Sequence, residues 1–285
     1  GAASTRAALR SPSAAKPSDR HCVSSKASRS PVTQWSEYVK LQRIYMHKHR
    51  LLTALCAAVA SMSAAVAEES ANWTYKLTPS FYATDNERNA VDINLRANHG
   101  PHALWIGQYE RGQDFKQTRT GYEYTANYEW GQVVPSLQMA TGGFVGGSLG
   151  LQIGNPVYLI AGFGRTNLRD YYNLNFDPND MVTWGLGARL DNGHQVSVFT
   201  VKDNRLATDQ IITHGVWRWQ ATPLVRWTVD VAHKDGRSSP GELRVAGNSV
   251  SIGYDRGPHF VRVAFDQKVN FSDNNQTRVS AGLRF

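Results

Sequence analysis

The stretch AVDINLRAN, residues 90–98, alternates apolar and polar side chains without a break. Val91, Ile93 and Leu95 fall on one face of an extended chain, while Asp92 and Arg96 fall on the other. Because side chains alternate along a β-strand with a period of two, this stretch predicts a strand with one apolar and one polar face. No helical spacing of apolar residues competes with it, so the fold class turns on whether the pattern repeats.

The same alternation recurs along the chain, for example in WTYKLTPSF (73–81), YEYTANYEW (122–130), LVRWTVDVA (224–232) and TRVSAGLRF (277–285). The pattern predicts an all-β protein of fourteen antiparallel strands, at residues 73–82, 90–98, 103–111, 118–129, 132–141, 147–154, 156–164, 180–190, 194–202, 209–219, 223–233, 246–255, 259–268 and 277–285. The count depends on PSLQMATGGFVGGSLGLQIG (135–154), whose glycines 142, 143, 146 and 147 form either a hairpin tip or one irregular excursion. Twelve strands is therefore the alternative to fourteen.

Alternation by itself fits a soluble β-sandwich as well as a membrane barrel, but two features favour the barrel. Aromatic residues gather toward strand ends on the apolar faces, as interfacial girdles require: Trp73, Tyr75, Trp105, Tyr122, Tyr128, Trp130, Trp184, Trp217, Trp219 and Trp227. Connectors also alternate in length, with short ones such as NHGP (98–101) and QATP (220–223) between long ones such as KDGRSSPGELR (234–244). This asymmetry predicts a transmembrane up-and-down β-barrel.

Residues 46–67 have the pattern of a cleavable signal peptide. Lys48 and Arg50 precede a short uncharged apolar run, and Ala65-Val66-Ala67 supplies small residues in the positions a signal peptidase needs. We expect cleavage after Ala67, which leaves residues 68–285 as the mature barrel. The upstream segment, 1–45, lacks apolar periodicity, so we expect it to be a disordered extension absent from the mature protein, with Met46 as the true start.

Removing residues 1–67 changes the charge balance of the chain. These residues hold ten Lys plus Arg and two Asp plus Glu, so 31 − 10 and 23 − 2 leave 21 of each, and the mature chain is neutral. Both cysteines, Cys22 and Cys56, are removed as well. The mature protein therefore offers no basic surface for nucleic acid and no cysteine for a disulfide, a metal site or a nucleophile.

Signal, alternation and turn asymmetry together make residues 68–285 resemble a Gram-negative outer-membrane β-barrel protein. The terminal VSAGLRF (279–285) resembles the last strand of that class, in which the final aromatic, here Phe285, belongs to the assembly signal. The resemblance implies a place in the cell outer membrane, with outer-membrane lipids, lipopolysaccharide and the barrel-assembly machinery as partners. It does not select a particular family within the class.

Function then depends on the side chains that face the lumen. The alternation places these residues inward: Lys76, Asp92, Arg96, Glu123, Arg189, His214, Arg218, Arg226, Asp230, Arg262, Asp266, Lys268, Arg278 and Arg284. One interpretation is structural, with charges on neighbouring strands pairing to brace a narrow barrel. The other is a water-filled pore whose arginines favour small anionic or polar solutes. Both can hold in part.

The segment TNLRDYYNLNFDPND (166–180) is the most distinctive long connector. It is expected either to fold inward as a constriction or to contact a ligand outside the barrel. Asp177, Asn179 and Asp180 have oxygen donors for calcium, but turn chemistry around Pro178 explains them more simply, so we predict no metal.

An outer-membrane lipid-modifying hydrolase is a rival class, since some barrels of this kind modify lipid A or phospholipids. Its nucleophile and base must share a face, yet His194 and Ser197 are three residues apart in one strand, and Thr213 is adjacent to His214. We therefore predict no catalytic site and no cofactor. A passive channel is the favoured function, with a non-conducting structural or binding barrel as the alternative.

Overall fold

The computed structural model describes residues 73–173 and 177–285. The signal peptide and the upstream extension expected at residues 1–67 lie outside them. The strands are β1 (Trp73–Thr84), β2 (Ala90–His99), β3 (His102–Arg111), β4 (Phe115–Tyr124), β5 (Ala126–Tyr128), β6 (Gly131–Ala140), β7 (Phe144–Ile153), β8 (Val157–Thr166), β9 (Met181–Arg189), β10 (His194–Asp203), β11 (Ile211–Thr222), β12 (Val225–Gly236), β13 (Val245–Arg256), β14 (His259–Asp266) and β15 (Gln276–Arg284). A 3₁₀ turn, η1 (Val269–Phe271), precedes β15.

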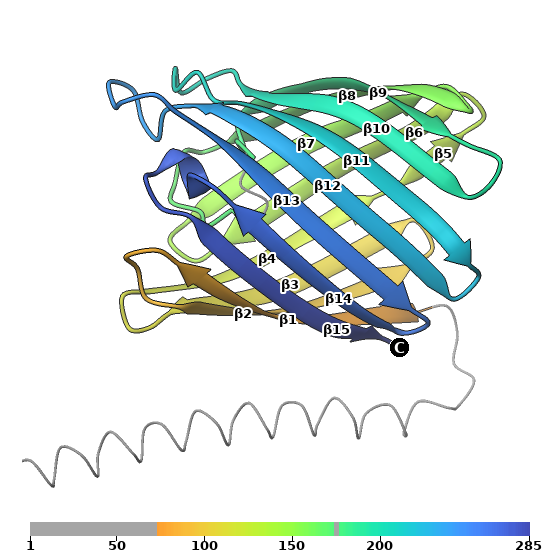
Figure 1. Ribbon diagram of the computed structural model, residues 1–285, viewed down its shortest axis with the longest axis horizontal. Coiled ribbons are helices and arrows are strands. Elements are labelled where there is room, and N and C mark those ends of the chain that lie inside the picture. The colour runs from red at the N-terminus through yellow and green to blue at the C-terminus, as the bar shows by residue number, and fades with distance from the viewer. Residues whose placement is uncertain (1–72, 174–176) are drawn as a thin grey trace, which may run out of the picture. The chain divides into compact units, whose positions relative to one another are not determined.

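Strands that follow one another in the sequence pair antiparallel, except β4 with β5, and β1 pairs with β15 to close the sheet into a barrel (Figure 1). Because β4 and β5 both pair with β6, they are two parts of one barrel strand. The fifteen strand segments therefore make a barrel of fourteen strands, which confirms the predicted fold and count. The glycine-rich segment forms a hairpin whose tip contains Gly142 and Gly143, both at positive φ, where glycine meets no steric penalty.

The connectors differ sharply between the two ends of the barrel (Figure 1). At one end they are tight, such as residues 100–101 between β2 and β3 and residues 223–224 between β11 and β12. At the other end they include residues 167–180, 237–244 and 267–275. We call these the short-turn end and the long-loop end, and the adjoining halves of the wall the short-turn half and the long-loop half. Trp73 and Phe285 both lie at the short-turn end.

The outer surface of the barrel is apolar. Large hydrophobic side chains such as Ile106, Leu186 and Val198 are 52%, 57% and 60% exposed. A continuous exposed apolar band of this kind is unfavourable in water and matches the hydrocarbon region of a bilayer. No helix in the described ranges is long and apolar enough to span a membrane.

An aromatic belt rims the outer face at the short-turn end. Trp73 stacks on Tyr75 and on His99, with ring centroids 6.4 and 4.8 Å apart, and Tyr128 stacks on Trp130 at 5.0 Å. Trp217 and Trp219 continue the belt on β11, where both stack with His194. Amphipathic rings at this level suit a membrane–water interface.

Candidate functional site

The predicted lumen residues lie in rows that cross neighbouring strands on the inner face. Arg284, Lys76 and Arg96 are direct register partners on β15, β1 and β2. Lys268 is the exception: β14 ends at Asp266, and Lys268 has a left-handed backbone at φ 51°. The expectation that Lys268 belongs to the strand wall was therefore wrong, and it instead pairs with Asp273 in the loop before β15.

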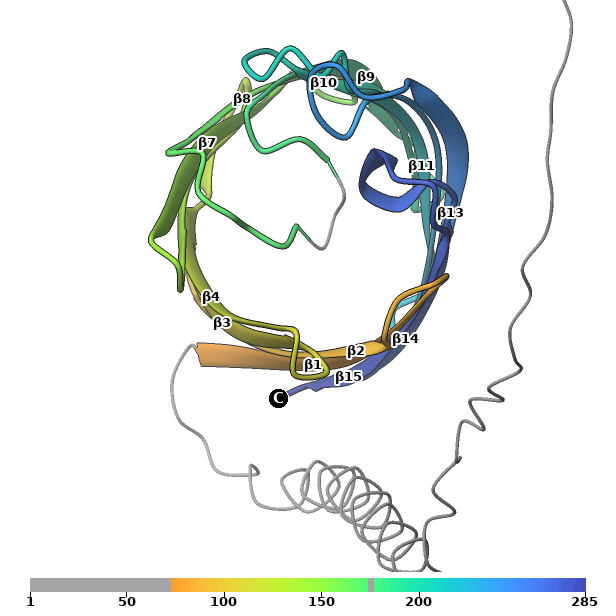
Figure 2. The ribbon, with the colours of Figure 1, turned by 90° about the vertical axis from the view of Figure 1, so that its left-hand side faces the viewer.

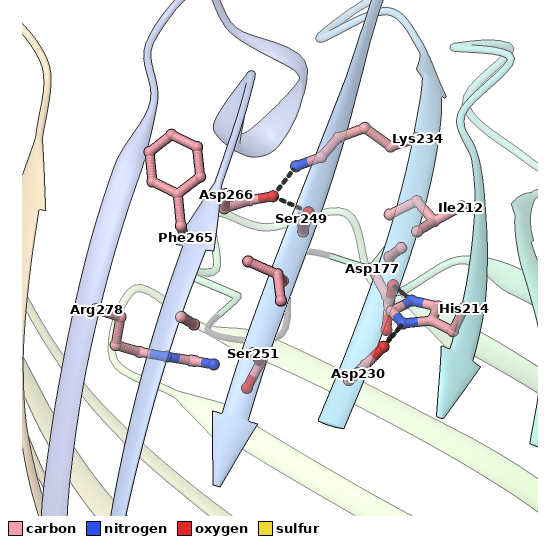
Figure 3. A pocket seen from close by; sticks show the side chains of 13 residues that line it. Asp177, Ile212, His214, Asp230, Lys234, Ser249, Ser251, Phe265, Asp266 and Arg278 are labelled. Carbon is pink, nitrogen blue, oxygen red and sulfur yellow. Dashed lines mark hydrogen bonds and ion pairs between the residues drawn. The ribbon is translucent and has the colours of Figure 1, made fainter. Parts of the chain in front are cut away.

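In the long-loop half, wall charges form buried ion pairs. Arg119 of β4 pairs with Asp92 of β2, and each side chain is 2% exposed. Lys234 of β12 pairs with Asp266 of β14, which also accepts a hydrogen bond from Ser249 (Figure 3). Charges so far removed from water are tolerated because they are paired.

Arg119 and Lys234 were missing from the sequence-based set of lumen residues. Each lies four residues from a predicted inward residue on the same strand, Arg119 before Glu123 and Lys234 after Asp230. Since inward positions repeat every second residue, extending the alternation toward the strand end would have identified both.

His214 of β11 lies between two carboxylates (Figure 3). Its Nδ1 lies 3.0 Å from Oδ1 of Asp230 on β12, and its Nε2 lies 3.1 Å from Oδ1 of Asp177 in the connector between β8 and β9. The ring of Phe199 stacks on the imidazole at 4.8 Å. His214 thus joins the barrel wall to the connector.

The connector between β8 and β9 enters the lumen, as Figure 2 shows for its described residues. The ring of Tyr172 stacks on Tyr109 of β3, with centroids 3.8 Å apart, and its backbone N–H donates to Oε1 of Gln117 at 2.9 Å. Tyr171 stacks on Phe144 of β7 at 4.2 Å and donates from its hydroxyl to Gln138 at 3.1 Å. The segment therefore occupies part of the lumen in the long-loop half.

The three oxygen donors considered for calcium have other partners, and Asn179 accepts a hydrogen bond from Asn173 at 3.4 Å. Asp177 contacts His214, whereas Asp180 accepts hydrogen bonds from Thr166 at 2.5 Å and from Arg205 at 3.0 Å. Within the described ranges, no group of three or more His, Cys, Asp or Glu side chains is placed to hold a metal ion. The carboxylates of this connector therefore serve to hold it against the wall.

In the short-turn half, the wall carries more cations than anions. Asp255 of β13 accepts from both Arg226 and Arg284, and Glu123 of β4 accepts from Arg96. The basic residues on this part of the wall are Lys76, Arg96, Arg189, Arg218, Arg226, Arg262 and Arg284. Their surplus over Asp255 and Glu123 leaves a net positive inner surface.

Several of these cations contact aromatic or neutral groups rather than carboxylates. The Lys76 ammonium lies 4.6 Å from the Phe260 ring, and Arg189 lies 4.3 Å from the Tyr158 ring and donates to Gln152 at 2.9 Å. Among the residues that the structure describes, no carboxylate forms an ion pair with Arg218 or Arg262. These guanidinium groups have donors left for water or a solute.

A cavity of about 530 Å³ lies in the lumen, bordered by Arg96, Glu123 and Gln138 on the wall and by Tyr171 and Asn179 of the connector. Trp105 also lines it. The expectation that Trp105 joins the outer girdle was therefore wrong. Leu104 and Ile106 on either side of Trp105 face outward, so the alternation itself turns the indole inward.

The histidine pairs considered for catalysis are divided between the two faces of the wall. His194 stacks within the outer aromatic belt. Ser197 is the cross-strand register partner of Val216 and faces the lumen with it. Thr213 bonds to Thr200, and His214 faces the lumen. Neither pair brings a nucleophile within reach of its base.

Solved structures of outer-membrane proteins match this chain in fold. No family model matches the chain, and no curated protein matches its sequence. Among solved structures, Omp33, an outer membrane protein of Acinetobacter baumannii, superimposes with a TM-score of 0.52 at 11% identity, over 76% of this chain and 100% of that one. The KdgM porin gives 0.43 at 9% identity over 74% and 99%, and OprD from Pseudomonas aeruginosa gives 0.40 at 10% over 75% and 93%. The chain thus has the closed fourteen-strand fold of an outer-membrane β-barrel protein.

Proposed function

We propose that the protein is a passive outer-membrane channel for small polar solutes, with a preference for anions. The observation that carries the proposal is the surplus of cations on the inner wall of the short-turn half, where Arg218 and Arg262 have no ion pair within the described ranges. Buried bracing charges would be paired, as Arg119 and Asp92 are. Surplus arginines that line a hydrated lumen instead raise the local concentration of anions.

The cavity in the lumen, which Arg96 helps to line, supports the same function. At about 530 Å³ it is within the volume range of small-molecule sites, so the lumen at this level is not a packed core. The connector that carries Tyr171 and Tyr172 narrows the lumen on the long-loop side. A solute of modest size therefore meets a constriction first and the basic wall next.

The apolar outer surface and the aromatic belt support a location in the outer membrane. We propose that the barrel lies in the outer membrane, with lipids and lipopolysaccharide against its apolar outer surface, short turns in the periplasm and Phe285 presented to the assembly machinery. The protein purified from outer membranes should begin EESANWTYK, from cleavage after Ala67. An N-terminus within residues 1–45 would contradict both the signal peptide and the assigned start.

Planar-bilayer recording of the protein purified from outer membranes tests conduction. We expect discrete current steps. In a KCl gradient, the reversal potential should have the sign that indicates a preference for chloride over potassium. Arg218→Gln combined with Arg262→Gln should shift that potential toward potassium. A barrel that gives no steps would overturn the channel and favour the non-conducting structural or binding barrel.

A matched pair of lysines controls for charge alone. Lys76 faces the lumen, whereas Lys116 faces outward and pairs with Glu110 at 3.3 Å. Lys76→Gln should shift the reversal potential and Lys116→Gln should not. The proposal assigns no catalytic activity, so the same preparation should not hydrolyse labelled phospholipid or lipopolysaccharide, and turnover there would revive the hydrolase.

A further inference from the structure

A straight register row joins the cations of the short-turn half to an aromatic ring. Arg284, Lys76, Arg96, Trp105 and Gly121 are successive cross-strand partners on β15, β1, β2, β3 and β4. Among the tryptophans in the described ranges, Trp105 alone faces the lumen; the others belong to the outer surface or its rim. The row therefore places one large apolar surface at the end of a line of positive charge.

Gly121 gives the indole its position. A Cβ atom added at Gly121 would lie 2.5 Å from Cε2, Cζ2 and Nε1 of Trp105, which is closer than real contacts allow. The ring therefore lies against the backbone of β4, in space that only glycine leaves free. Its remaining surface lines the cavity of about 530 Å³. The ring is held against the wall and is still accessible.

Charged and neutral polar groups surround the Trp105 ring. Arg96 is directly opposite Trp105 and pairs with Glu123, and the two side chains are 33% and 31% exposed. Arg96 also donates from Nε to Asn98 at 3.1 Å. Further around the cavity lie neutral groups that both donate and accept hydrogen bonds, namely Asn94, Ser136, Gln138 and Ser148. The surroundings are close to neutral and rich in paired donors and acceptors.

These features match the chemistry of a sugar ring. A pyranose has an apolar C–H face, which packs against an aromatic surface, and a rim of hydroxyls that each donate and accept. Neighbouring hydroxyls fit a guanidinium donor beside a carboxylate acceptor, the arrangement that Arg96 and Glu123 provide. A purely anionic ligand would gain nothing from Glu123, and a purely aromatic one would leave Arg96 and Glu123 without new partners.

We infer that Trp105 is the stacking surface of a saccharide subsite in the lumen, with Arg96 and Glu123 binding the hydroxyls of a pyranose ring. This inference rests on the proposed channel, because it names the class of solute that the lumen takes. Lys76 and Arg284 continue the row beyond Arg96, so a pyranose that carries a carboxylate gains an added attraction.

Glucose and glucuronate test the subsite because they share a pyranose ring and differ at one carboxylate. Saturation-transfer NMR on the detergent-solubilised full protein should show binding of both, with the strongest transfer to C–H protons of one ring face. Trp105→Ala should weaken both by about tenfold, the effect of losing one aromatic contact of this kind. Lys76→Gln should weaken glucuronate and leave glucose unchanged.

Trp184→Ala is the matched control, since Trp184 is 46% exposed on the outer face. It should bind both sugars as the parent does. Gly121→Ala keeps the tryptophan but displaces its ring, so it should weaken both sugars too and guards against misfolding of Trp105→Ala. Trp105→Tyr, which keeps an aromatic ring, should restore part of the affinity.

The outcomes separate the subsite from the channel. Binding of both sugars by Trp105→Ala at the parent's affinity would overturn the saccharide subsite. So would a parent protein that binds adenosine, a ligand with an aromatic ring, and binds neither sugar. A parent protein that conducts chloride but shows no transfer to either sugar overturns the subsite and leaves the channel intact. Binding of both sugars by a barrel that gives no current steps overturns the channel and supports the subsite as part of a binding barrel.

Discussion

In the long-loop half of the barrel the wall charges are paired and buried, whereas in the short-turn half cations outnumber carboxylates. Asp92 and Arg119 form an ion pair that is buried from water. The connector that carries Tyr172 packs beside this pair, and the backbone carbonyl of Tyr172 accepts a hydrogen bond from Arg119. In the short-turn half the stacked rings lie outside instead, where the aromatic belt includes the contact between Tyr75 and Phe285. The long-loop half is stabilised by ion pairs inside the lumen, and the short-turn half by stacked rings on the outer face.

This difference explains how inward charges can brace the barrel in one half and line a pore in the other. Ion pairs deep in the wall are costly to break, because removing one partner strands the other. Belt residues of the short-turn half lie on the outer face and do not enter the lumen. The charges there are consequently available to a solute.

The largest effect is expected from breaking the buried pair. Asp92→Ala should lower the free energy of unfolding by about 3–5 kcal/mol, since Arg119 remains buried without its partner. Glu123→Ala, which removes the carboxylate of a solvated pair, should cost only about 0–1 kcal/mol. Urea unfolding of both variants in lipid vesicles measures the contrast, and equal losses would refute the division into halves.

A double variant tests the reason for that loss. Asp92→Ala with Arg119→Met removes both charges and keeps an apolar side chain of similar length. It should recover most of the stability that Asp92→Ala loses, because a buried ion pair is often replaceable by apolar packing. A double variant as unstable as the single one would mean that Asp92 acts through some other contact.

The next effect concerns the connector inside the lumen. Tyr172→Ala removes the stacking on Tyr109 and the contact of its hydroxyl with Nε2 of Gln276, 3.2 Å away. We expect a loss of about 1–3 kcal/mol and a larger single-channel conductance, since a bulky ring leaves the narrowed lumen. Tyr122→Ala, on the outer belt, should leave conductance unchanged. Equal currents in both variants would show that the connector does not limit flow.

A smaller effect is expected at the barrel seam. Phe285 stacks on Tyr75 at 5.6 Å, and the two residues exchange backbone hydrogen bonds of 2.6 and 3.0 Å. Phe285→Ala keeps the backbone bonds and loses the rings' contact, about 0.5–1.5 kcal/mol. Folding yield in vesicles, with and without the assembly machinery, measures the loss, and Phe285→Tyr should restore it. A defect seen only with the machinery would assign Phe285 to recognition rather than to packing.

Alternation predicted the strands, and together with connector length and aromatic placement it predicted the barrel, but its limits are visible in single residues. The period-two pattern of residues 90–98 correctly turned Asp92 inward, but its partner Arg119 is 27 residues away, and only the register of β2, β3 and β4 joins them. Trp105 was misplaced because a tryptophan near a strand end suits an interface, although its neighbours Leu104 and Ile106 already indicated the inward face.

The connector's path was beyond any local pattern. Tyr172 meets Gln117, 55 residues earlier, and Asp177 meets His214, 37 residues later. Such contacts depend on closure of the barrel, which brings distant strands around one lumen. The sequence of residues 166–180 was therefore compatible with an inward constriction and with an external loop alike.

The smallest effect on stability should come from the surplus arginines. Arg262 lies within electrostatic range of Arg278 and Arg218, which repel its charge, and of Asp255 and Asp230, which attract it. Arg262→Gln should change the free energy of unfolding by no more than about 0.5 kcal/mol, because repulsion and attraction on the wall offset each other. Lys234→Gln, in the long-loop half, should instead destabilise strongly, since Asp266 loses its buried partner. Chemical unfolding compares the two, and reversal potentials on the same proteins should move only for Arg262→Gln if the cations of the short-turn half serve the solute rather than the fold.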